Sequence, residues 1–200
     1  EEIQRAILQN RLPNFVWGKL YKKTLWEGIS MPEGQVMEDL YICPLVFMKA
    51  GRIVLDKRPL YFYSHENIRS ITSTEGKVYA RLRYGKFLAW REHEKIARQY
   101  FPEEEEKCVK EALHAAVRAR CLDAGADFLT DQEKSEIDSY IRKHYRISTP
   151  EMIPGIHRII LGNHKMLLKI IGKIQRVLVT YQQQQRQKRM QQKLAKRNRL

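Results

Sequence analysis

A long helical pattern broken by two strong stops constrains the fold most. Residues 79–100 read as one helix, which the Phe101-Pro102 pair ends because proline cannot continue a helix. Residues 103–124 read as a second, with four glutamates at its start that favour the helix dipole and Gly125 as its stop. A third runs from Thr130 or Asp131 to residue 144. Residues 78–151 are therefore predicted to be helical.

The first part of the chain has a mixed pattern. Residues 1–12 have helical spacing, and residues 38–48 form an apolar helical run in which Pro44 is expected to cause a kink. Residues 53–55 and 60–63 are short runs typical of strands, separated by a turn. This mixture predicts an α/β first part followed by a mainly α-helical C-terminal extension. The boundary is expected near residue 78.

Composition limits the class of protein. An apolar fraction of 43% is sufficient for a core, and no apolar run is long enough to cross a membrane. The three cysteines have no C-x-x-C spacing, which favours a reducing compartment and predicts a cytoplasmic protein. The chain begins with Glu1-Glu2 and is expected to start inside a longer protein. General signatures for nucleotide binding, serine hydrolysis and zinc proteolysis are absent.

Five short motifs follow one another between residues 14 and 73. They are Trp17-Gly18-Lys19-Leu20-Tyr21, Met31-Pro32-Glu33-Gly34, Glu38-Asp39-Leu40, Pro59-Leu60-Tyr61-Phe62-Tyr63 and Ser70-Ile71-Thr72. In this order they resemble the C-terminal half of bacterial family 2 glycosyltransferases of the GT-A fold. Residues 79–200 match only loosely, as a variable helical extension.

The resemblance implies an acceptor-side half of a sugar-transferring enzyme. Such an enzyme would move a sugar from a nucleotide-sugar donor to a hydroxyl of a glycan or lipid-linked acceptor, in cell-surface polysaccharide synthesis. The resemblance also implies a divalent metal, Mn²⁺ or Mg²⁺. The family's donor-binding half, with its D-x-D motif, has no counterpart here, so these residues alone are expected to be inactive.

The resemblance assigns the central chemistry to the acidic pair. Asp39 is the expected general base that takes the proton of the acceptor hydroxyl. Neighbouring helical residues point about 100° apart, so Glu38 would orient the acceptor instead. Acids in the first turn of a helix also stabilise its dipole, and that alternative stays open.

Five further residues are candidates by the same resemblance. Trp17 would form a wall of the sugar or acceptor pocket, or belong to the core. Lys19 would meet a phosphate or an acidic sugar, or be solvated. His65 would ligate the metal or donate to the diphosphate, while Arg69 would neutralise the leaving group and Ser70 would contact substrate.

The C-terminal segment is strongly basic. Residues 152–200 hold 12 of the lysines and arginines and no acid, which leaves residues 1–151 nearly neutral at +2. One predicted helical face is apolar: Leu167, Ile170, Ile171, Ile174, Leu178 and Tyr181. Another carries Lys165, Lys169, Lys173 and Arg176.

This split over residues 156–200 suits the cytoplasmic face of an anionic membrane, with packing or coiled-coil association as the alternative. Nucleic acid is disfavoured because no aromatic residue follows Tyr181.

The sequence thus predicts three segments: 1–77 as the enzyme part, 78–151 as a helical extension and 152–200 as a basic amphipathic tail. The competing function is a non-enzymatic helical module. It would dock to membrane, protein or RNA through the tail.

Overall fold

The computed structural model describes residues 1–63, 77–147, 155–162 and 164–197, and within these ranges every regular element is helical. The elements are α1 (Glu2–Leu8), η1 (Lys23–Trp26), α2 (Glu38–Met48), α3 (Lys77–Tyr100), η3 (Pro102–Glu104), α4 (Glu105–Asp123), α5 (Asp131–His144), α6 (Ile156–Leu161) and α7 (Lys165–Arg197). The predicted α/β class is therefore wrong, and the described chain is all-helical.

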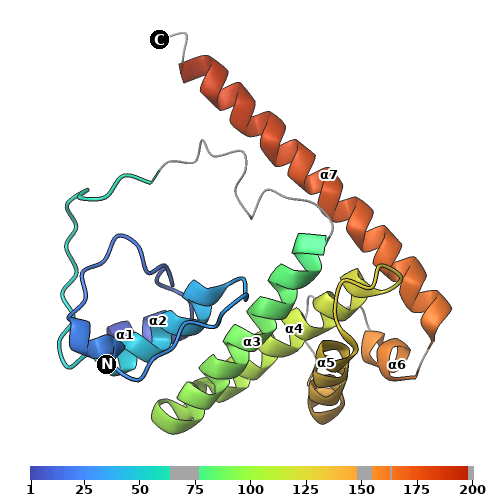
Figure 1. The fold of residues 1–200 in the computed structure, drawn as a ribbon, viewed down its shortest axis with the longest axis horizontal. Coiled ribbons are helices and arrows are strands. Elements are labelled where there is room, and N and C mark those ends of the chain that lie inside the picture. Colours follow the sequence, from blue (N-terminus) through green and yellow to red (C-terminus); the bar gives the residue numbers. More distant parts are fainter. Residues whose placement is uncertain (64–76, 148–154, 163, 198–200) are drawn as a thin grey trace.

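Helices α3 and α4 form the centre of the molecule (Figure 1). Helices α1 and α2 pack against α3 on one side of this pair. Helices α5 and α6 pack against α4 on the other side. The long helix α7 crosses the end of α4 and continues beyond it. The helices of the first and third predicted segments thus each pack against the middle segment.

The core lies between α3, α4 and α5. Its largest fully buried side chains include Phe87, Trp90, Leu113, Ile137 and Ile141. Fully burying such a side chain contributes roughly 1.5–3 kcal/mol relative to leaving it exposed. Leu8 of α1 and Leu40 of α2 belong to the same buried cluster, so the first two helices take part in this core.

Local signals set the helix ends correctly. The predicted helix at residues 38–48 is α2, and its bounds are confirmed. Gly125 has a φ of +73°, the left-handed conformation that ends a helix and that glycine adopts without strain. Thr130 and Glu133 form a reciprocal capping box at the start of α5.

The predicted strands at residues 53–55 and 60–63 do not form. Val54, Leu60 and Phe62 are 74%, 71% and 82% exposed, and the segment is extended without a described neighbour that could complete a ladder. Asp56 instead accepts hydrogen bonds from the backbone and guanidinium of Arg58, which closes a local turn. An isolated pair of short runs is too small to be stable as a sheet in water.

The predicted final helix is divided in two. It breaks around Gly162, so α6 ends at Leu161 and α7 begins at Lys165. A side chain at position 162 would lie 2.5 Å from the Arg158 carbonyl oxygen, closer than real contacts allow. The break gives α7 a direction of its own.

A buried histidine joins the first two helices to α3. His93 is fully buried, with Nδ1 2.7 Å from the Leu8 carbonyl oxygen and Nε2 2.8 Å from that of Leu40. Leu40 lies four residues before Pro44, which has no N–H to donate to it. The ring of His93 therefore takes the place of a missing helical hydrogen bond.

A close backbone contact fixes the loop before α2. A side chain at Gly85 of α3 would lie only 2.0 Å from the Val36 carbonyl oxygen. Glycine is thus required where α3 meets this loop. The loop leads directly into Glu38 and Asp39, so the contact positions the acidic pair.

Candidate acceptor-side site

The segment 15–21 lies across the first turn of α2, and this is where the candidate site forms. The carboxylate of Asp39 accepts a hydrogen bond from the backbone N–H of Val16. The charges of Lys19 and Glu38 both act on this carboxylate. Four of the predicted site residues, Trp17, Lys19, Glu38 and Asp39, are therefore brought together by the fold.

The environment of Asp39 favours its protonated form. Burial raises the pKa of the Asp39 carboxyl above its ordinary value, and the negative charge of Glu38 raises it further. The Val16 hydrogen bond and the charge of Lys19 act in the opposite direction and reduce the increase. A carboxylate with a raised pKa binds a proton more readily, which is the property that a general base needs.

A ladder of stacked aromatic rings is built around Trp17, the residue that follows Val16 in the chain. Trp17 stacks on Phe15 at 4.4 Å between ring centroids and on Tyr63 at 4.5 Å, and Tyr61 lies 5.2 Å from Trp17. Phe15, Tyr61 and Tyr63 remain 43%, 54% and 46% exposed. Trp17 is therefore part of a half-exposed surface rather than of the main core.

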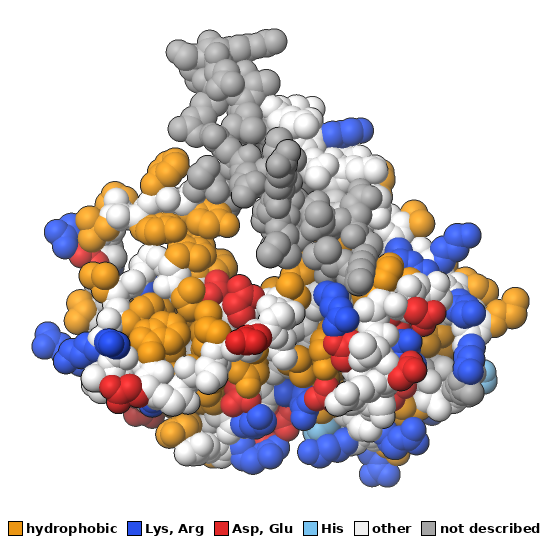
Figure 2. Space-filling view, viewed as in Figure 1, with side chains coloured by type: hydrophobic (Ala, Val, Ile, Leu, Met, Phe, Trp, Pro, Cys, Tyr) orange, Lys and Arg blue, Asp and Glu red, His pale blue; other side chains and the backbone are white. Residues whose placement is uncertain are grey.

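This aromatic ladder, Phe15, Trp17, Tyr61 and Tyr63, depends on the path of the backbone. Gly18 has a φ of +68°, and a Cβ there would contact the ring of Tyr61 at 3.6 Å. Apolar side chains gather over this part of the surface, on the left of Figure 2. The stacking was missed from sequence because it joins residues more than 40 positions apart.

The ammonium group of Lys19 is bound by backbone carbonyl oxygens. The Lys19 Nζ donates to the carbonyl oxygens of Phe15 and, at 3.3 Å, of Pro13. The positive charge therefore stays close to the start of the segment and to Asp39. The prediction that Lys19 binds a phosphate or acidic sugar stays a prediction.

Two further groups lie behind Asp39. Burial raises the pKa of the Tyr21 hydroxyl and raises that of the Cys43 thiol to about 11. Tyr21 packs edge-on against Trp26 and Phe47. The charge of Asp39 also raises the pKa of both groups, so Tyr21 and Cys43 lie near its carboxylate.

The remaining predicted residues, His65, Arg69 and Ser70, lie outside the described residues. Within the described ranges no group of three or more His, Cys, Asp or Glu side chains could hold a metal ion. The chemistry considered below therefore uses no step through a metal.

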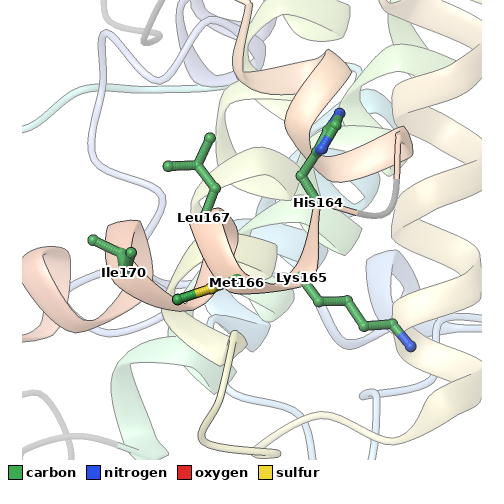
Figure 3. Close-up of a pocket in the computed structure, with 5 residues that line it drawn as sticks. All are labelled: His164, Lys165, Met166, Leu167 and Ile170. Atoms are coloured by element: carbon green, nitrogen blue, oxygen red, sulfur yellow. The ribbon is translucent and has the colours of Figure 1, made fainter.

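A second surface lies on α7, far from the acidic pair. A shallow depression at the start of this helix is lined by Met166, Leu167 and Ile170, with His164 and Lys165 at its edge (Figure 3). Its lining is almost wholly apolar, so it offers no chemistry of the kind found at Asp39.

The chain matches no protein-family model, no curated protein and no solved structure. The described residues also lack the strands that a GT-A fold requires. The resemblance to family 2 glycosyltransferases is therefore corrected. Five short motifs in order were too few to identify a fold, because each also suits a loop or a helix start.

Proposed function

We propose that residues 15–63 form the acceptor-binding surface of a sugar-transferring protein, with Asp39 as the general base. The observation that carries this proposal is the placement of a carboxyl of raised pKa one residue away from the aromatic ladder, through the Val16 hydrogen bond. Perturbed carboxyl groups beside a partly apolar surface are candidates for functional sites. The proposal rests on these residues and on no fold family.

The aromatic ladder supplies a reason for a sugar ligand. The apolar C–H face of a sugar ring packs on the flat face of an aromatic side chain, while its hydroxyls stay free for hydrogen bonds. Exposed aromatic rings of this number are unusual for a surface that binds nothing. An acceptor hydroxyl held over the ladder would be within the neighbourhood of Asp39.

In the proposed reaction, Asp39 removes the proton of the acceptor hydroxyl as its oxygen attacks the anomeric carbon of the donor. The bond from that carbon to the nucleotide diphosphate breaks, and the diphosphate leaves with the electron pair. The positive charge of Lys19 opposes the increase in the pKa of Asp39 that burial and Glu38 cause. General base catalysis of this kind contributes about 10²–10⁴-fold.

The test compares transfer from a panel of nucleotide sugars to oligosaccharide acceptors, with Mn²⁺ or Mg²⁺ present, by the full-length protein as wild type and as Asp39→Asn. Asparagine keeps the shape and can still accept from Val16, so acceptor binding should persist while transfer falls about 10²–10⁴-fold. Glu38→Gln is the matched control and should retain most activity. Undiminished transfer by Asp39→Asn would contradict the role of Asp39.

A second candidate function is favoured by the exposed apolar face of α7, described below. In this alternative the chain is a helical interaction module without catalysis. Absence of transfer by the wild type with every donor, together with absence of oligosaccharide binding to the ladder, would favour the module over the enzyme.

A further inference from the structure

Helix α7 is apolar on two opposite sides. Leu168, Gly172 and Val179 are buried on the side that packs against the rest of the molecule. Ile170, Ile174 and Tyr181 each follow one of these residues by two positions, which is about 200° around a helix. They therefore lie on the opposite side, where they are 49%, 55% and 59% exposed.

We define the α7 stripe as the exposed apolar residues Leu167, Ile170, Ile174, Val177, Leu178 and Tyr181. It is about 21 Å long at 1.5 Å per residue. A continuous apolar face of this kind on a surface helix marks an interaction site.

The contacts between α7 and α4 keep the α7 stripe facing away from the core. A side chain at Gly172 would lie 2.4 Å from the Cys121 carbonyl oxygen, so α7 touches the end of α4 backbone to backbone. Arg176 donates to the carbonyl oxygens of Leu122 and Ala124, at 2.7 and 2.9 Å. These contacts fix the rotation of α7, so the stripe cannot turn inward to the core.

The charge beside the stripe identifies the class of partner. Lys165, Lys169 and Lys173 are exposed along one flank of the helix, and the chain has no acid after Glu151. Lysines flanking an apolar face are typical of helices that lie in the interface of an anionic bilayer.

A second copy of the chain fits the stripe less well. Leu167, Ile174 and Tyr181 follow heptad spacing, but Gln185 and Lys188 occupy the next positions. The apolar seam therefore covers about two heptads, whereas stable coiled coils need three to four.

We propose that α7 is an interfacial helix that docks the protein on anionic lipid bilayers through the α7 stripe, with its lysine flank facing the headgroups. No described helix is long and apolar enough to cross a membrane. Tyr181, at the C-terminal end of the stripe, suits the headgroup level because its ring is amphipathic. This docking is independent of the sugar-transfer proposal.

The experiment is flotation of the 200-residue chain with vesicles of phosphatidylcholine alone or mixed with phosphatidylserine. Binding is expected for the mixed vesicles and should weaken as salt is raised, because salt screens the lysines. Ile174→Glu should reduce the affinity about ten- to a hundredfold, the equivalent of losing the burial of one large apolar side chain. Changing Lys165 and Lys173 together to Gln should reduce it about tenfold or more.

Gln182→Glu is the matched control, because it adds the same charge at an exposed position of α7 off the stripe and should bind nearly as wild type. Circular dichroism should show unchanged helicity in every variant. Asp39→Asn should bind vesicles normally, which separates this test from that of sugar transfer.

Three results would overturn the proposal. One is equal binding, or none, to neutral and anionic vesicles. Another is a concentration-dependent dimer that Ile174→Glu abolishes, which would assign the stripe to a second copy. The third is binding to RNA that depends on the lysines and is unchanged by Ile174→Glu.

Discussion

At the residue scale, burial and hydrogen bonding favour opposite charge states of the His93 ring. Its two ring nitrogens both face carbonyl oxygens, an arrangement that only a doubly protonated ring satisfies completely. Burial opposes the charge and lowers the pKa of His93 below its ordinary value of 6.5, despite those carbonyls. The folded protein therefore holds this ring mainly neutral at pH 7.

The consequence is a loss of stability in mild acid. Because the unfolded chain takes up the proton first as pH falls, the stabilisation is complete above about pH 6.5 and decreases below it. We expect the free energy of unfolding from urea titrations to fall between pH 7.5 and 5.5, at up to about 1.4 kcal/mol per pH unit.

His93→Gln should lower the stability but flatten this pH dependence. His144→Gln is the control, because His144 also has a pKa lowered by burial but lies at the end of α5 and is only partly buried. The control should leave most of the slope in place. A slope that persists in His93→Gln would show that other groups cause it.

At the same scale, the sequence indicated some of the residues of the candidate site but not the contacts that hold them. Trp17, Lys19 and Asp39 were singled out and do lie together. The Val16 hydrogen bond and the stacking of Tyr63 on Trp17 could not be predicted, because both are contacts between distant segments. His93 was not among the predicted site residues, although it is the buried junction of three helices.

At the scale of elements, the absence of a side chain at Gly85 allows the loop before α2 to pack closely on α3. An alanine in a helix interior is normally favoured over glycine by about 1 kcal/mol. At Gly85 the added methyl group would meet the Val36 carbonyl oxygen at 2.0 Å, so the sign should reverse. We expect Gly85→Ala to destabilise the protein by about 1–3 kcal/mol in urea titrations.

Gly51→Ala is the control, since a Cβ there meets nothing within 4 Å. It should be neutral or slightly stabilising. An unchanged stability in Gly85→Ala would mean that the loop before α2 moves freely away from α3.

Helices were predictable and strands were not, for a reason that belongs to this scale. The ends of α4 and α5 depend on signals within a few residues, such as Gly125 and the Thr130 capping box. A strand needs a partner that local sequence does not contain. Residues 53–55 and 60–63 had the composition of strands but have no described partner.

At the scale of the whole molecule, α7 is held by a small contact for so long a helix. Gly172→Ala places a methyl group against the end of α4. Arg176→Gln removes the two hydrogen bonds from Arg176 to the carbonyl oxygens at that end of α4. We expect each change to increase hydrogen exchange in α7 while α3 and its core remain protected.

Gln182→Ala, at an exposed position of the same helix, should leave the exchange of α7 unchanged. Equal protection of α7 in all three variants would show that the buried apolar side chains alone hold the helix. Increased exchange throughout the molecule would instead make α7 part of a single cooperative unit with the core.

The proline in α2 has an evolutionary consequence. With no N–H at position 44, the Leu40 carbonyl has no partner in its own helix, and the Nε2 of His93 lies 2.8 Å from it. A residue other than proline at position 44 would return that carbonyl to its own helix and release position 93 from the requirement. Positions 44 and 93 should therefore covary among descendants of this chain: proline retained with a donor, or both replaced.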